Sequence, residues 1–275
     1  MFFDHLPIGG FICGHRGARS IAPENTLLSM VKAMECGAHC LETDVRMSKD
    51  GELVIFHDNT LARTTDVADR PEFQAMRPWR TGLFTAAQLE QLDCGSWFLR
   101  DDPFGTVESG EVPKEEYDTI RRQKIPRLVD LLNFSRKNSY PVNLEIKDRG
   151  DSPGKTEIVD LVVDVLTATQ TMDLVLLSSF REEYLRRAVA LNPRVSIAVP
   201  AEKQHHPDLL PYLKSFPACA YHPHEKLCTK EIIHHVQGAG IRVNCWTVND
   251  RNRAGELLRS GVGVITDRPQ RLVAG

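Results

Sequence analysis

Two histidines enclose a pair of carboxylates near the N-terminus of the chain. His15 and His57 stand at the two ends of this stretch, and Glu42 and Asp44 lie between them. These two acids are two positions apart in a strand-like segment, so their side chains point to the same face of a β-strand. Two carboxylates ~4 Å apart repel each other by about 4 kcal/mol at an effective dielectric constant near 20. Because a hard divalent cation prefers oxygen ligands and removes this repulsion, the pattern predicts a metal site.

A third acidic residue comes from a later strand-like segment. Glu145 and Lys147 are again two positions apart and therefore share one face. A single glutamate on a strand is usually an exposed rim residue. One that points into a barrel already holding the first two acids is expected to be a third metal ligand. The two histidines suit general acid and base chemistry, because imidazole titrates near neutral pH.

Other polar and aromatic positions have an ordinary structural explanation beside a functional one. The segment Pro23–Thr26 is typical of a helix start. Trp246 ends a late strand-like segment, where it is either a core residue or a wall of the substrate site. The remaining histidine pairs lack the spacing of metal ligands on a helix, and we interpret them as surface residues. They are His205, His206, His222, His224, His234 and His235.

Strand-like and helix-like segments alternate along most of the chain. The predicted strands are 11–15, 41–47, 53–56, 142–146, 174–177, 194–199, 218–221, 241–246 and 263–265. Strands separated by helices pair in parallel through right-handed crossovers. About eight of them favour an α/β fold, a closed TIM (β/α)₈ barrel, whose functional groups gather at the C-terminal ends of the strands. A doubly wound open sheet is the alternative, but no GxGxxG turn follows the first strand.

The alternation stops between residues 59 and 124. A loop of this length without secondary structure is improbable in a compact domain, so we expect a small insertion subdomain within a single domain of residues 1–275. Four large aromatic residues of the insertion either form its own core, which we favour, or line an apolar rim for an acyl chain. They are Trp79, Phe84, Trp97 and Phe98.

The composition is that of an ordinary globular protein. The 275 residues include 34 basic and 37 acidic side chains, a balance that gives no basic footprint and excludes nucleic acid as the main partner. Seven cysteines without paired CxxC motifs predict free thiols in a reducing compartment. No segment reaches the ~20 apolar residues of a membrane span. We therefore expect a cytoplasmic protein without stable membrane insertion.

Short motifs spread along the chain resemble, in order, those of the glycerophosphodiester phosphodiesterase family. They are His-Arg-Gly at 15–17, Pro-Glu-Asn-Thr at 23–26, Glu-Thr-Asp-Val at 42–45, Ser-Lys-Asp-Gly at 48–51, His-Asp at 57–58, Gly-Ser-Trp-Phe at 95–98, Leu-Glu-Ile-Lys at 144–147, Ser-Phe at 179–180, Trp-Thr-Val-Asn at 246–249 and Thr-Asp-Arg-Pro at 266–269. No single motif is specific, but the ordered set is.

The resemblance implies a TIM barrel with a small insertion after the second strand region. It implies that Glu42, Asp44 and Glu145 bind one divalent cation, Mg²⁺ or Ca²⁺. His15 and His57 correspond to the general acid and base, and Arg16 and Lys147 to positions that contact the phosphate.

The implied reaction is hydrolysis of a small-molecule glycerophosphodiester, such as glycerophosphocholine or glycerophosphoethanolamine, to sn-glycerol 3-phosphate and an alcohol. A lysophospholipase D or a phosphoinositide-type phosphodiesterase on the same barrel is the alternative. A catalytically silent binding module would be expected to lack a histidine or a metal ligand, and none is missing here.

Overall fold

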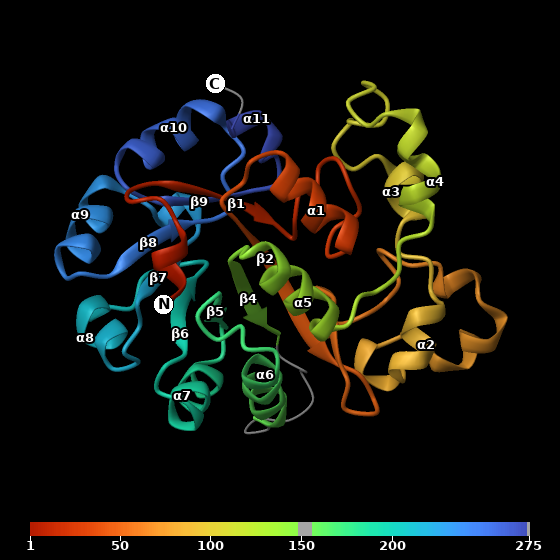
Figure 1. Ribbon diagram of the computed structural model, residues 1–275, viewed down its shortest axis with the longest axis horizontal. Helices are drawn as coiled ribbons and strands as arrows, with labels where there is room; N and C mark the ends of the chain where they lie inside the picture. Colours follow the sequence, from red (N-terminus) through yellow and green to blue (C-terminus); the bar gives the residue numbers. More distant parts are fainter. Residues whose placement is uncertain (148–155, 274–275) are drawn as a thin grey trace.

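The computed structural model of the protein describes residues 1–147 and 156–273. Within these residues, eight parallel strands close into a barrel in the order β1-β2-β4-β5-β6-β7-β8-β9, because β1 pairs with both β2 and β9 (Figure 1). The short strand β3 runs antiparallel to β2. The predicted TIM barrel is confirmed, and the open sheet is wrong. The strands are β1 (Phe11–His15), β2 (Cys40–Met47), β3 (Leu53–Ile55), β4 (Val142–Ile146), β5 (Val175–Ser178), β6 (Ser196–Ala201), β7 (Ala220–Pro223), β8 (Arg242–Cys245) and β9 (Gly263–Thr266).

Helices surround the barrel on its outside (Figure 1). They are α1 (Leu27–Glu35), α5 (Leu128–Asn138), α6 (Glu157–Ala168), α7 (Glu182–Leu191), α8 (Leu209–Lys214), α9 (Lys230–Gly238), α10 (Arg251–Arg259) and α11 (Gln270–Val273). The sequence pattern predicts helices at 27–34, 157–166, 182–191, 229–239 and 249–260, and these correspond to α1, α6, α7, α9 and α10. It does not predict α5, α8 or α11. No helix in the described ranges is long and apolar enough to cross a membrane.

The alternation of side chains along β2 and β4 explains why acidic residues face the barrel interior. Leu41 and Val45 of β2 and Leu144 of β4 are buried in the main hydrophobic cluster, which packs the strands against the helices. Each such burial contributes about 1.5–3 kcal/mol. A shift of one residue would exchange the two faces. The apolar outer face therefore fixes Glu42 and Asp44 on the inner face.

A short N-terminal helix fills one end of the barrel. This helix, η1 (Phe2–His5), places Phe2 at 1% exposure. Phe2 and Leu6 pack against residues of β1, β2, β5, β6 and β7, including Phe11 and Cys40. Because Phe11 and Cys40 begin their strands, this packing occupies the N-terminal end of the barrel.

Residues 59–124 form a group of short helices beside α1 and α5 (Figure 1). They are η2 (Val67–Asp69), η3 (Pro71–Met76), η4 (Thr81–Leu83), α2 (Ala86–Gln91), α3 (Ser96–Asp101), η5 (Lys114–Glu116) and α4 (Tyr117–Arg121). We refer to residues 59–124 as the insertion.

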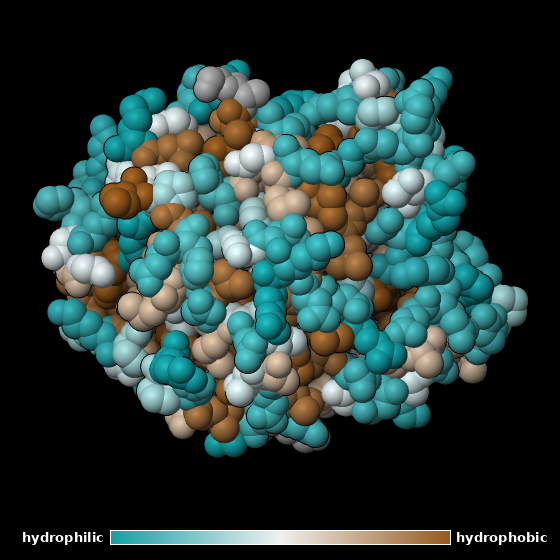
Figure 2. Space-filling view, viewed as in Figure 1, coloured by the Kyte–Doolittle hydropathy of each residue, from teal (hydrophilic) through white to brown (hydrophobic). Residues whose placement is uncertain are grey.

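The four large aromatic side chains of the insertion are buried. Trp79 and Phe84 belong to one hydrophobic cluster, and Trp97 and Phe98 to a second, against which Leu28 of α1 packs. Figure 2 shows hydrophobic side chains at the surface where α1 faces the insertion. The burial supports the interpretation of these aromatic residues as packing residues and not as an apolar rim.

Gly95 precedes α3 at a close approach between backbones. A Cβ atom here would lie 1.7 Å from the carbonyl oxygen of Ile120, so the chain would have to shift. Because overpacking typically costs 1–3 kcal/mol, we expect Gly95→Ala to lower the free energy of unfolding by about 2 kcal/mol, measured by urea denaturation. Gly238→Ala is the control, because no atom outside the neighbouring residues and backbone of its own helix lies within 4 Å of its Cβ position. Equal stability losses in the two variants would contradict this explanation.

Candidate active site

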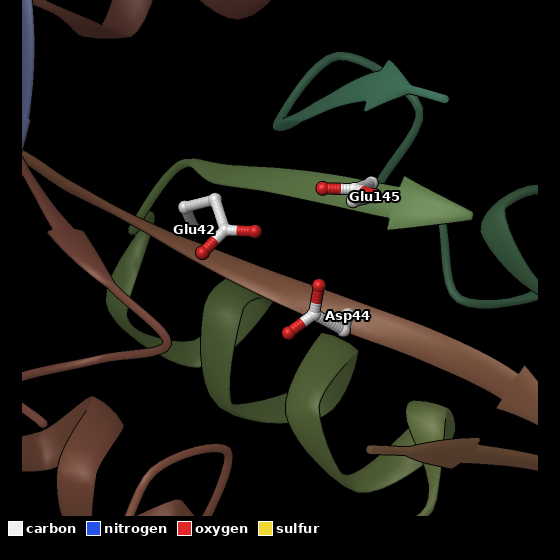
Figure 3. A group of neighbouring side chains, drawn as sticks. All are labelled: Glu42, Asp44 and Glu145. Carbon is white, nitrogen blue, oxygen red and sulfur yellow. The ribbon is translucent and has the colours of Figure 1, made fainter. Parts of the chain in front are cut away.

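The structure brings the three predicted acidic residues together. Glu42 and Asp44 come from β2 and Glu145 from the neighbouring strand β4, where it pairs directly with Asp44. One oxygen of each carboxylate lies within 4.8 Å of the others, and the three side chains turn toward one another (Figure 3). The exposed fractions of Glu42 and Asp44 are only 5% and 1%. We call these residues the acidic triad.

Burial and mutual repulsion oppose the ionisation of the triad carboxyl groups. Burial, reinforced by Asp44 and Glu145, raises the pKa of Glu42 well above its usual range. Burial also raises the pKa of Glu145, although Lys147 opposes this shift. Burial would raise the pKa of Asp44 too, but Lys147 and Arg16 outweigh it and lower that pKa. The site therefore holds more negative charge than the environment easily stabilises.

Two cationic side chains compensate part of this charge. Lys147 places Nζ 2.6 Å from Glu145 Oε1 and 3.0 Å from Asp44 Oδ1. The backbone N–H of Arg16 donates to Glu42 Oε2 at 3.0 Å, and its guanidinium Nε lies 3.5 Å from Asp44 Oδ2. Two cations beside three carboxylates leave a net negative charge. The charge balance thus favours a divalent cation.

The donor set also fits a hard cation. Asn25 donates from Nδ2 to Asp44 Oδ2 at 2.8 Å and accepts from Thr43 Oγ1 at 2.8 Å, so its amide is oriented. The other oxygen, Asp44 Oδ1, is buried and accepts no hydrogen bond of good geometry, since its contact with Lys147 is an ion pair only. An oriented carboxylate with a free oxygen, beside two further carboxylates, is the chemistry that Mg²⁺ and Ca²⁺ require.

His15 ends β1 and is held by a carboxylate from the last strand region. Its Nδ1 lies 2.6 Å from Asp267 Oδ1, and its Nε2 is 3.8 Å from Glu42 Oε2. Asn249 donates to the second oxygen of Asp267 at 2.7 Å. Because a carboxylate only accepts, Nδ1 carries the proton and Nε2 faces the site. Burial lowers the pKa of His15 to about 4 although Asp267 opposes it, so the ring is neutral at pH 7.

His57 is held in the same way, by the carboxylate of the next residue. Its Nδ1 lies 2.6 Å from Asp58 Oδ1. Arg63 holds Asp58 with two contacts, Nε to Oδ2 at 2.6 Å and Nη2 to Oδ1 at 3.1 Å. Arg46 donates to the carbonyl oxygen of His57 at 2.7 and 2.8 Å. Both histidines therefore present Nε2 as the free nitrogen.

Both histidines and two members of the triad, Glu42 and Glu145, line a cavity of about 400 Å³ at the C-terminal ends of the strands. Arg16 and Lys147 also line it. Residues that follow β5, β6 and β8 complete the lining, among them Phe180, Glu202 and Trp246. The Trp246 ring packs edge-on against Phe180 with centroids 5.8 Å apart, and Trp246 therefore lies at the wall of the cavity.

The expectation that His222 is a surface residue is wrong. His222 is 2% exposed on β7, lines the cavity and lies within 2.8 Å of Asn244 Nδ2 through its Nε2. Burial lowers its pKa to about 3. The predicted strand 218–221 ends one residue before His222, whereas β7 continues to Pro223. The alternation along β7 turns Tyr221 toward the helices and His222 toward the interior.

The roles of several polar residues around the site are not evident from the sequence. Asp58 and Asp267 orient the histidines, and adjacency to His57 is the only local signal for the first of them. Glu24 and Asn25 of the Pro-Glu-Asn-Thr motif contact the site rather than only beginning a helix.

The chain is similar to known proteins over nearly its whole length. The model of the Glycerophosphoryl diester phosphodiesterase family matches residues 15–271. A Bacillus altitudinis glycerophosphodiester phosphodiesterase is 30% identical over 95% of this chain and 96% of its own length. A Gallus gallus glycerophosphodiester phosphodiesterase domain-containing protein 5 is 30% identical over 93% of this chain, which spans only 41% of that relative.

The fold comparison agrees with the sequence. The structure of an Oleispira antarctica phosphodiesterase in complex with the product sn-glycerol-3-phosphate superimposes with a TM-score of 0.80, at 28% identity, over 98% of this chain and 96% of that one. The barrel, the triad and the family match over residues 15–271 lead to one conclusion. The chain belongs to the glycerophosphodiester phosphodiesterase family, a family of phosphoric diester hydrolases.

Proposed function

We propose that this protein is a metal-dependent hydrolase of glycerophosphodiesters, such as glycerophosphocholine and glycerophosphoethanolamine, which releases sn-glycerol 3-phosphate and an alcohol. The observation that carries the proposal is the pair of aspartate-held histidines that line one cavity together with Glu42 and Glu145 of the acidic triad. The product bound to the Oleispira antarctica relative supports the same product here.

The triad would hold one Mg²⁺ or Ca²⁺ ion, which supplies Lewis-acid stabilisation of charge on the phosphoryl oxygens. Lys147 lines the cavity and adds a positive charge for the same purpose. Arg16 also lines the cavity, but its guanidinium is engaged by Glu24 at 2.8 Å. We therefore assign Arg16 first to charge compensation of the triad and second to phosphate contact.

The histidines would divide the proton transfers between them. The Nε2 atom of one ring, neutral at the start, accepts the proton of the attacking hydroxyl. The other ring must enter the step as the imidazolium, protonated on both nitrogens, so that its Nε2 donates a proton to the leaving alcohol oxygen. Each transfer contributes about 10²–10⁴-fold in rate. The nucleophile is either the glycerol 2-hydroxyl of the substrate, giving a cyclic phosphate that water then opens, or water itself. His15 is neutral at pH 7, which is the protonation state that a base requires.

Two further observations bear on the setting of the reaction. All seven cysteines are free thiols, which supports a reducing, cytoplasmic location.

The alternative, a lysophospholipase D or phosphoinositide-type enzyme, gains no support from the aromatic residues of the insertion, because Trp79 and Phe84 are packed in its core. Trp246 is proposed as a wall for the substrate instead.

Removing either histidine should slow turnover strongly without unfolding the protein. We expect His15→Ala and His57→Ala each to lower kcat on glycerophosphocholine by about 10²–10⁴-fold, measured by enzymatic detection of sn-glycerol 3-phosphate. The matched control is His234→Ala, because His234 is exposed on α9. Wild-type rates in either active-site variant would refute the assigned role.

Metal binding should depend on the triad. We expect Mg²⁺ or Ca²⁺ to bind the wild-type protein in calorimetric titrations and to raise its Tm. Loss of residues that only support ligands costs about 10–100-fold in affinity, so Glu145→Gln should cost at least as much. Glu108→Gln, at an exposed glutamate, is the control. Equal affinities in Glu145→Gln and the control would show that the ion binds elsewhere.

A further inference from the structure

We propose that Glu24, Arg19 and Arg63 form a relay that positions both catalytic histidines, and that the insertion serves the active site by fixing the two arginines. The proposal rests on the roles given above to the histidines. Within the relay, Glu24 is the hub, and each arginine connects it to the aspartate that holds one histidine. These are positioning residues, since none of them is assigned a contact with the substrate.

Glu24 is a buried carboxylate shared by three guanidinium groups. Its side chain is 3% exposed. It accepts from Arg63 Nη2 at 2.6 Å and Nη1 at 3.0 Å, from Arg19 Nη2 at 2.7 Å and from Arg16 Nη1 at 2.8 Å. Burial would raise the pKa of Glu24, but the arginines lower it to about 2, so the group is ionised. A neutral residue here would leave three close cations without a common partner.

The arm toward His57 runs through Arg63. The same guanidinium that binds Glu24 also binds Asp58, with Nε 2.6 Å from Oδ2. Asp58 in turn lies 2.6 Å from His57 Nδ1. Because a planar guanidinium holds two carboxylates in fixed relative positions, this arm restrains the imidazole ring as well as its tautomer.

The arm toward His15 runs through Arg19. Its Nη2 binds Glu24 at 2.7 Å, and its Nη1 lies 3.5 Å from Asp267 Oδ1, the oxygen that holds His15. This last contact is longer than any in the other arm. Asp267 has a second support from Asn249 at 2.7 Å. We therefore expect the Arg63 arm to matter more than the Arg19 arm.

The insertion provides the surfaces on which both arginines lie. Arg63 belongs to the insertion, and its guanidinium carbon is 5.9 Å from the centroid of the Trp97 ring. The guanidinium carbon of Arg19, from the barrel, is 5.4 Å from the centroid of the Phe104 ring. Trp97 is itself fixed, since it is 6% exposed and donates from Nε1 to the carbonyl of Cys94 at 2.9 Å. Such cation–π contacts orient a guanidinium group without neutralising it.

Positioning of this kind affects rate more than binding. A displacement of ~1 Å in a catalytic group can cost about 10²-fold in rate. We expect Arg63→Met, which keeps the aliphatic stem but cuts the arm to His57, to lower kcat by about 10–100-fold and to change KM by less than about threefold. Arg63 is partly exposed, so the variant should fold. Arg100→Met is the control, because Arg100 is an exposed arginine of the insertion paired with Asp101.

A second readout does not depend on turnover. The Nδ1–H protons of His15 and His57, each bonded to a carboxylate at 2.6 Å, should give separate downfield NMR signals. Arg63→Met should shift or broaden the His57 signal alone. Arg19→Met should act on the His15 signal alone, and Arg100→Met on neither.

The hub is tested by Glu24→Gln, which should disturb both histidine signals and lower kcat at least as far as Arg63→Met. If Glu24→Gln does not fold, Arg63→Met and Arg19→Met test the relay in its place. Unchanged histidine signals and unchanged kcat in Arg63→Met would overturn the relay. If the wild-type protein cleaves no glycerophosphodiester, the proposed function is refuted. The relay is then still tested by the effect of the variants on the histidine NMR signals.

Discussion

The crowding of three carboxylates inside the barrel is the constraint on which the rest of the site depends. Buried charges are tolerated only when charges of opposite sign surround them. Lys147 and Arg16 lie next to the triad, and Glu24 lies next to Arg16. Arg19 and Arg63 surround Glu24 on its other sides. The charges thus alternate in sign along a chain of contacts that starts at the triad and ends at Asp58 and Asp267, the two aspartates that hold the histidines.

The fold was predictable because its main signals are local. Alternation of apolar residues placed the strands, and the two-residue spacing of Glu42 and Asp44 put both on the inner face. The exception is β3. Its sequence predicts one more strand of the parallel barrel, but it pairs antiparallel with β2. The turn between them is only a few residues long, with Ser48 N–H bonded to the Glu52 carbonyl at 2.9 Å, and a parallel pair needs a far longer crossover.

The site was predictable only where its chemistry is local. The histidines and Glu145 stand at or near strand ends and follow the barrel rule. Glu42 and Asp44 lie within the longer strand β2, level with His15 and Glu145. Their supports do not: Asp267 is 252 residues from the His15 ring it holds, and Arg63 meets Glu24 across 39 residues. These pairings exist only once the barrel has closed and the insertion has packed. The prediction of a surface position for His222 is wrong for a related reason, because a histidine at the edge of a predicted strand does not show which face of the strand it occupies.

The two histidines differ in how the sheet holds their backbone. This difference accounts for the place of the insertion in the chain. His15 sits on a barrel strand, directly paired in register with Glu42, so the sheet itself fixes its position. His57 lies beyond the end of β3, outside the parallel barrel, and the sheet offers it no such restraint. Its restraints are arginines: Arg46 on its carbonyl, and Arg63 on its aspartate. The insertion begins directly after this histidine and brings Arg63 with it. We infer that the chain adds structure at the point where the barrel supports His57, a proposed catalytic group, less than it supports His15.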